Sequence, residues 1–138
     1  MIFAGFNLVA VLLAMVASMA IGAIWYSVLT KPWMAAAGFN AQQIDAVEKG
    51  GSPLVYVIAA ISHLVMATVL AGLIGHLGDM NLWRGIVSAL FVWSGFVATT
   101  MVVTHRFQMR PWSLTFIDAG HYLFALVAQG AIIGWMGV

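Results

Sequence analysis

Four long apolar stretches set the pattern of hydrophobic and polar positions along this chain. They cover residues 2–29, 54–77, 85–104 and 113–138, and they contain almost no charged residues. A helix that crosses a bilayer needs about 20 consecutive apolar residues, and each stretch reaches that length. The pattern therefore predicts an all-α fold, in which one integral membrane domain over residues 1–138 forms an antiparallel bundle of four helices.

The longest polar segment, between the first and second stretches, predicts one more short helix over about 41–49. Asn40 is placed to cap its start, and Gln43 can reach back to the backbone of the cap, so that the two form a capping box. Ile44 and Val47 share one face of this helix. We therefore expect it to lie in the membrane interface, with docking to a partner protein as the alternative interpretation.

The composition excludes several classes of protein. Hydrophobic residues make up 64% of the chain and charged residues 7%, so the sequence cannot supply the polar surface of a soluble domain. The lack of cysteine excludes disulfides, thiolate nucleophiles and sulfur-ligated metals. A net charge of +1 leaves no basic patch for nucleic acid, and we expect the lipid bilayer to be the main surroundings of the chain.

The charges in the loops predict how the chain is oriented. The loop after the first stretch carries Lys31 and Lys49, and the loop after the third carries Arg106 and Arg110. The loop on the opposite side has only Arg84. Because basic loops tend to stay in the cytoplasm, we expect a multi-pass protein of a bacterial inner membrane with both termini on the non-cytoplasmic side.

Small residues at four-residue spacing indicate where the helices pack. One such row runs along the first stretch at Ala10, Ala14, Ser18 and Gly22. Gly130 and Gly134 form a GxxxG pair in the last stretch. Within lipid, small residues let helix backbones approach closely and gain dispersion contacts. We interpret both sets as packing surfaces of the bundle, with a homodimer contact through Gly130 and Gly134 as the alternative.

A few polar residues lie inside the predicted spans and are the candidate binding site or ion path. With a rise of about 1.5 Å per residue, His63 and His121 both lie about 12–13 Å from the predicted cytoplasmic ends of their helices. Asp118 precedes His121 by three residues and shares its helix face, and Thr99 lies about 6–8 Å deep. We expect these groups to converge in the cytoplasmic half of the bundle. One inward-facing stripe of the last helix is predicted to contain Asp118, His121, Ala125 and Gln129.

Three interpretations of the Asp118 carboxylate remain open. A carboxylate at this depth costs about 2–3 kcal/mol on insertion scales unless it is paired or protonated. In the first interpretation, Asp118 is satisfied by the histidines, by neighbouring threonines or by Arg110, and has a structural role. In the second, it forms a proton- or ion-handling site with the histidines. In the third, His63 and His121 ligate a metal or haem from facing helices, although no metal or cofactor is assigned.

Sequence signatures of enzymes are missing from the chain. It contains no Gly-x-Ser-x-Gly, no His-Glu-x-x-His, no Walker loop and no dinucleotide fingerprint. Glutamate occurs once, at Glu48, in the loop that follows the first stretch. The chain offers few carboxylates to a membrane hydrolase that uses them in pairs, and we expect no enzymatic activity.

Several short motifs resemble those of a known family. They are Gly22-Ala-Ile-Trp25-Tyr26-Ser27, Lys31-Pro-Trp33-Met34, Trp93-Ser94-Gly95-Phe96, and Ala119-Gly120-His121-Tyr122-Leu123 followed by Gly130-Ala131-Ile132. With these motifs the chain resembles, over almost its full length, the bacterial family called domain of unknown function 1761. The resemblance implies a four-helix integral membrane protein. It implies no established activity and no site residues.

Two functions are consistent with these patterns. We favour a small accessory or structural subunit that packs against itself or against a larger membrane complex, because packing surfaces are extensive and no substrate apparatus is evident. The alternative is a minimal transporter or channel with His63, Asp118 and His121 along its path. Four helices leave little room for a pore in one protomer, so this alternative requires at least a dimer.

Overall fold

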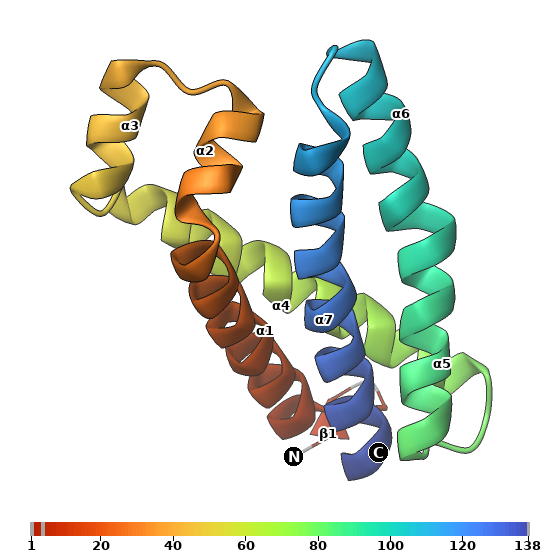
Figure 1. The fold of residues 1–138 in the computed structure, drawn as a ribbon. Coiled ribbons are helices and arrows are strands. Elements are labelled where there is room, and N and C mark those ends of the chain that lie inside the picture. The colour runs from red at the N-terminus through yellow and green to blue at the C-terminus, as the bar shows by residue number, and fades with distance from the viewer. Residues whose placement is uncertain (1, 4, 138) are drawn as a thin grey trace.

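Four long helical segments form the molecule, and the computed structural model describes residues 2–3 and 5–137. The segments run alternately up and down (Figure 1). They are α1 (Leu8–Val28), α4 (Pro53–His76), the continuous run α5 (Leu82–Val92), η1 (Trp93–Ala98) and α6 (Thr99–Phe107), and α7 (Trp112–Met136). Each segment is long and apolar enough to cross a membrane. The all-α, four-helix architecture predicted from the hydrophobic pattern is confirmed.

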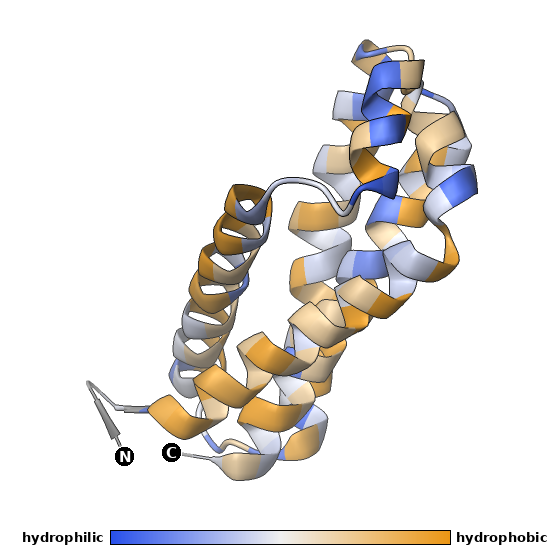
Figure 2. Cartoon of the chain, turned by 90° about the vertical axis from the view of Figure 1, so that its left-hand side faces the viewer, coloured by the Kyte–Doolittle hydropathy of each residue, from blue (hydrophilic) through white to orange (hydrophobic). Residues whose placement is uncertain are grey.

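Two short helices, α2 (Thr30–Ala37) and α3 (Ala41–Glu48), join α1 to α4. Figure 2 shows hydrophilic residues gathered at the end of the bundle that carries these helices. We call this end, together with the turn between α6 and α7, the basic end, because it carries Lys31, Lys49, Arg106 and Arg110. The opposite end, where α1 begins and α7 finishes, is called the terminal end.

The apolar run predicted a first helix that starts at residue 2, but the helix begins at Leu8. Two short strands, β1 (Ile2–Phe3) and β2 (Phe6–Asn7), pair antiparallel before it. Gly5 lies at φ +84°, a left-handed conformation that suits glycine and does not continue a helix. Asn7 then caps α1, because its side-chain oxygen accepts a hydrogen bond from the Ala10 amide at 3.2 Å. The predicted span was taken from hydrophobicity alone, whereas the start of the observed helix is set by the turn at Gly5 and the cap at Asn7.

The predicted capping box of α3 is confirmed. The Asn40 side chain accepts a hydrogen bond from the Gln43 amide at 2.8 Å, and the Gln43 side chain accepts one from the Asn40 amide at 2.9 Å. The sequence did not predict α2, which follows α1 after a break at Leu29. Its Met34 is buried, and Gly38 ends it in the left-handed conformation. This extra helix packs against α7.

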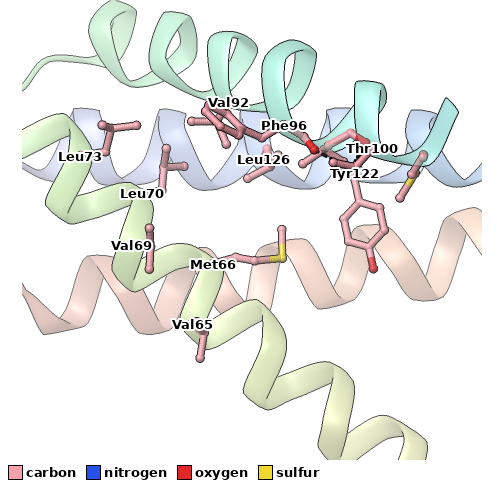
Figure 3. A pocket seen from close by; sticks show the side chains of 12 residues that line it. Val65, Met66, Val69, Leu70, Leu73, Val92, Phe96, Thr100, Tyr122 and Leu126 are labelled. Carbon is pink, nitrogen blue, oxygen red and sulfur yellow. Dashed lines mark hydrogen bonds between the residues drawn. The ribbon is translucent and has the colours of Figure 1, made fainter. Parts of the chain in front are cut away.

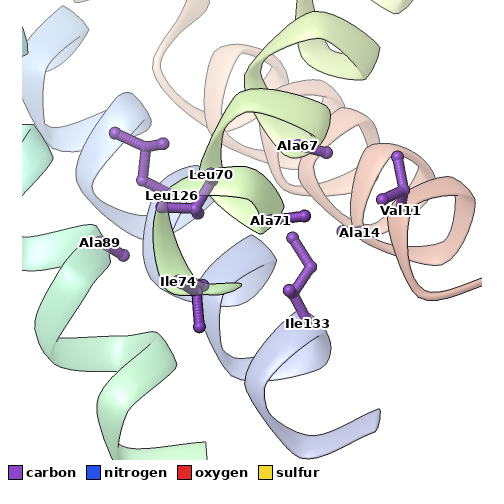
Figure 4. Packing of buried hydrophobic residues seen from close by; sticks show 9 residues of the cluster. All are labelled: Val11, Ala14, Ala67, Leu70, Ala71, Ile74, Ala89, Leu126 and Ile133. Atoms are coloured by element: carbon purple, nitrogen blue, oxygen red, sulfur yellow. The ribbon is translucent and has the colours of Figure 1, made fainter. Parts of the chain in front are cut away.

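The apolar core occupies the part of the bundle nearer the terminal end (Figure 4). Its members come from all four segments and are Val11, Ala14, Ala67, Leu70, Ala71, Ile74, Ala89, Leu126 and Ile133. Four of these nine residues are alanines, which permit close approach of the helix backbones. The predicted row on α1 forms part of this packing, since Ala10, Ala14 and Ser18 are all buried.

Glycines set the contact between α5 and α7. A Cβ atom added to Gly130 would collide with the Gly85 carbonyl oxygen, and one added to Gly134 would collide with the Asn81 carbonyl oxygen. Both glycines are buried within the same chain. The alternative of a homodimer contact through Gly130 and Gly134 is therefore wrong in this structure, because the α5 backbone already occupies that surface.

The N-terminal part of α4 diverges from the rest of the bundle. Residues 53–58 are all exposed, although consecutive residues of a helix point in every direction around its axis. Figure 2 shows this part of α4 separated from the other helices towards the basic end. From His63 onward the same helix has buried residues on one side.

Candidate functional site

Asp118 lies where α1, α6 and α7 meet. The Tyr26 hydroxyl of α1 donates a hydrogen bond to one carboxylate oxygen of Asp118 at 2.7 Å. His105 of α6 approaches the other carboxylate oxygen, with 3.8 Å between Nε2 and Oδ2. The Asp118 side chain is 21% exposed, so it is largely withdrawn from the surroundings. The carboxylate therefore has partners on two helices, which lowers the penalty for placing it inside a bundle.

Two buried histidines face each other one turn deeper. The rings of His63 and His121 have centroids 5.9 Å apart, and the two residues are only 5% and 4% exposed. His63 Nδ1 lies 2.8 Å from the Ala59 carbonyl oxygen of its own helix. Its Nε2 atom and both ring nitrogens of His121 have no hydrogen-bond partner in the described part of the chain.

Aromatic rings surround this histidine pair. Tyr26 lies 5.1 Å from His121 between ring centroids, which connects the histidines to the Asp118 carboxylate. Tyr122 packs edge-on against His121 at 4.6 Å and parallel to His63 at 6.2 Å. Gly22, the last small residue of the predicted row, leaves room for the imidazole, because a Cβ atom there would lie 2.8 Å from His121 Nε2.

Gln129 extends the polar groups beyond the histidines towards the terminal end. It is fully buried, and its Nε2 group donates to the Ser18 hydroxyl at 2.9 Å and to the His63 carbonyl oxygen at 3.2 Å. Its Oε1 atom has no partner among the described residues. The amide thus ties α7 to both α1 and α4 while keeping one acceptor free.

Arg106 and Thr115 continue the polar groups towards the basic end. Arg106 Nη2 donates to the Thr115 hydroxyl at 2.9 Å, and the same hydroxyl lies 2.9 Å from His105 Nδ1. The guanidinium carbon of Arg106 lies 3.7 Å from the centroid of the Trp112 ring, a cation–π contact. Arg106 Nη2 also donates to the Arg110 carbonyl oxygen at 3.0 Å. These contacts fix a cation at the edge of the site.

We call this whole set the polar seam. Its members are Ser18, Tyr26, His63, His105, Arg106, Thr115, Asp118, His121 and Gln129. On α7 it extends from Thr115 to Gln129, about 21 Å at 1.5 Å per residue. Ile133, one turn further, belongs to the apolar core. The seam therefore starts at the basic end, passes the middle of α7 and is closed by apolar packing.

Two tryptophans hold α7 from opposite sides next to Asp118. The Trp25 indole donates to the Ile117 carbonyl oxygen at 2.9 Å, and the Trp93 indole donates to the Ala119 carbonyl oxygen at 2.8 Å. Gly120 makes the Trp25 contact feasible, since a Cβ atom there would lie 2.9 Å from the indole ring. These bonds connect α1 and η1 to the same turn of α7. They fix the rotation of α7 that presents Asp118 to Tyr26.

The structure brings together three of the four predicted site residues. His63, Asp118 and His121 lie in the polar seam, and the predicted inward stripe of α7 is confirmed, because His121, Ala125 and Gln129 are buried. The structure does not bring Thr99 to the other three. Its side chain is exposed, and its hydroxyl donates to the Gly95 carbonyl oxygen of its own helical segment at 2.8 Å. Depth alone placed Thr99 near the site, whereas the rotation of its helix turns it outward.

Sequence reasoning missed Tyr26, His105 and the two tryptophans as parts of the site. Tyr26 and His105 were placed near helix ends, where polar tips have a simpler explanation. A signal was nevertheless present, because the family-like motifs around Trp25, Trp93 and His121 are the segments that meet here. For the metal alternative, the described residues contain no group of three or more His, Cys, Asp or Glu side chains that could hold an ion.

The fold and the seam together define a class: a protein of four helices that are long and apolar enough to cross a membrane, with a set of buried polar residues between them. The chain belongs to the family described as protein of unknown function (DUF1761), which matches residues 9–134. This confirms the resemblance seen in the sequence motifs. No curated protein and no solved structure matches the chain.

Proposed function

We propose that this protein is a small membrane transporter that handles protons through the polar seam, with Asp118, His121 and His63 as the protonatable site. One observation carries the proposal. Three ring nitrogens of the two buried histidines have no partner among the described residues, within a cluster that also contains a carboxylate.

The physical argument rests on the hydrogen-bonding requirement of imidazole. A neutral imidazole always carries one N–H donor and one acceptor nitrogen, so His121 leaves both unused in this arrangement. Each buried polar group without a partner costs about 1–3 kcal/mol. A bundle held together only by packing would be more stable with apolar residues there. An imidazole can bind and release a proton, which makes transient proton binding a reason to keep histidine there.

The charges in the loops support a direction in which protons would move through the seam. The four cations of the basic end favour a cytoplasmic position for that end, which would place both termini on the other side of a bacterial inner membrane. A proton would then enter past Arg106 and His105, reach Asp118 and Tyr26, and continue to the histidines. We infer proton binding and transfer without covalent chemistry, and therefore no enzymatic role.

Reconstituted proton flux tests this proposal. Liposomes containing the purified protein and the pH-sensitive dye pyranine are given a potassium diffusion potential, and the internal pH is followed. We expect flux above that of empty liposomes, reduced about tenfold or more by Asp118→Asn and by His63→Ala, because each removes a proton-accepting group from the seam.

His76→Ala is the matched control for His63→Ala. His76 lies on the same helix and makes the same kind of contact, with Nδ1 2.8 Å from the Gly72 carbonyl oxygen, but it is exposed and outside the seam. It should leave flux unchanged. Size-exclusion profiles verify that all variants remain folded. Absence of flux in the parent protein, or equal flux in parent and both seam variants, would refute the proposal.

The divergence of α4 favours a second candidate, an accessory or structural subunit. Residues 53–58 make no buried contact within this chain, so this half-helix is available to a second copy or to a larger membrane complex. Gentle purification from the native membrane followed by mass spectrometry tests this role. Stoichiometric recovery with larger membrane proteins would support it, and recovery of the chain as a monomer would contradict it.

A further inference from the structure

A lateral groove lies beside the polar seam, between α4 and the continuous segment formed by α5, η1 and α6 (Figure 3). Its volume is about 430 Å³, and α7 forms its floor through Tyr122 and Leu126. The lining is apolar except for two hydroxyl-bearing side chains, Thr100 and Tyr122. Ligand sites in proteins have this composition, predominantly apolar with a few polar groups, and volumes of about 300–1,000 Å³.

We propose that this groove binds a single-chain amphiphile, with its apolar chain along the groove and a carboxylic acid or alcohol head at the Tyr122 hydroxyl. This site is distinct from the proton path and does not depend on the transport proposal. At roughly 30 Å³ per non-hydrogen atom, the value for liquid water, the groove accommodates about 14 atoms. That size corresponds to one medium-length chain.

Tyr122 determines where the head of the ligand lies. Figure 3 shows its ring extending from α7 with the hydroxyl at the far end, on the side where α4 diverges. Its ring is the wall between the groove and the histidine pair, since it packs on both His63 and His121. A purely hydrocarbon ligand would gain nothing at this point. A head that donates or accepts a hydrogen bond would gain one interaction in apolar surroundings.

The walls of the groove contain a π-helical segment and flexible methionine side chains, both of which are common at ligand sites. One wall is η1, a π-helical segment that contributes Phe96 and Val97, and π-helical turns are rare and frequently found at functional sites. Met66 of α4 and Met101 of α6 also line the groove. Their unbranched side chains fill irregular gaps and adjust to different ligands.

Native mass spectrometry of the whole protein in detergent, with dodecanoic acid as the probe and dodecane as the headless comparison, tests the proposal. We expect one bound acid per chain and weaker binding of the alkane. Tyr122→Phe keeps the ring and removes the hydroxyl, and should weaken acid binding about 2- to 10-fold, the effect of one lost hydrogen bond. Binding of the alkane should not change.

A bulky substitution on the wall gives a second, independent readout. Val69 lines the groove and is 66% exposed, so Val69→Trp should fill it without disturbing the core and should abolish acid binding. Val103→Trp is the matched control, because Val103 is also exposed, lies on α6 and does not line the groove. It should bind the acid like the parent protein.

Three results would overturn the proposal. Equal binding of acid and alkane would show that the groove holds only ordinary hydrocarbon chains. Unchanged acid binding in Val69→Trp would place the ligand elsewhere. A stable dimer that Val69→Trp dissociates, with no acid bound to the parent protein, would assign the groove to a second copy of the chain. Each of these results leaves the proton-flux measurement unaffected, so the two proposals fail independently.

Discussion

The close contact between α5 and α7 makes Gly130→Ala the most informative single substitution for the fold. The added methyl group would collide with the carbonyl oxygen of Gly85, and it would lie 2.9 Å from the carbonyl carbon of the same residue and 2.9 Å from Ala89 Cβ. Two of these three atoms belong to the backbone of the neighbouring helix. They cannot rotate away as a side chain can, so the helices must separate along the contact.

The size of the effect follows from two opposing terms. Overpacking a tightly fitted contact costs about 1–3 kcal/mol, and a clash with backbone atoms falls at the upper end of that range. Alanine in a helix is favoured over glycine by about 1 kcal/mol. We therefore expect Gly130→Ala to lower the free energy of unfolding by about 2 kcal/mol. Gly95→Ala has the same propensity gain with nothing within 4 Å of its Cβ, and should be neutral or stabilising by up to about 1 kcal/mol.

Reversible unfolding in mixed detergent micelles, titrated with SDS and followed by circular dichroism, measures both variants under the same conditions. The expected difference between them is up to about 3 kcal/mol, the cost of the clash, because both variants share the propensity gain. Equal stabilities would refute the close α5–α7 contact. Loss of a dimer by Gly130→Ala with unchanged monomer stability would instead restore the homodimer interface at Gly130 and Gly134.

Three further substitutions probe the site. Trp25→Phe removes one indole hydrogen bond to α7 and should destabilise the protein by about 1 kcal/mol in the same unfolding titration, whereas Trp135→Phe, on a residue that is 76% exposed, should have no effect. Gly22→Ala should displace the His121 ring and reduce proton flux while the size-exclusion profile stays unchanged, and unaltered flux would contradict this. Gln129→Leu should change the free energy of unfolding by less than about 1 kcal/mol, because it removes the unpartnered Oε1 acceptor together with the hydrogen bonds made by Nε2. A loss of stability above about 3 kcal/mol would show that Oε1 has a hydrogen-bond partner.

The sequence predicted the helical framework and one face of the site. Segment lengths came from hydrophobicity, and the burial of His121, Ala125 and Gln129 came from helix periodicity, since residues three or four apart share a face. The small residues of α1 were recognised as packing positions for the same reason. These features depend on local spacing along one helix, which the sequence displays directly.

The composition of the site could not be predicted to the same extent. Which residues of α1 and α6 meet Asp118 depends on how those helices are rotated and shifted relative to α7. Tyr26 reaches the carboxylate across 92 positions of sequence, and no local pattern encodes that distance. Thr99 illustrates the same limit, because its depth along the helix could be predicted from the sequence but the direction of its side chain could not.

The sequence by itself determined that the chain forms four apolar helices with loops of known polarity, because hydrophobic length and capping residues act locally. Only the tertiary structure decided that Gly130 and Gly134 pack within one chain, that Trp25 and Trp93 fix α7, and that the two buried histidines face each other. Those outcomes depend on how each helix is rotated and on the angles at which the helices cross. Both are set by contacts between side chains far apart in the sequence, so the sequence of a single helix does not determine them.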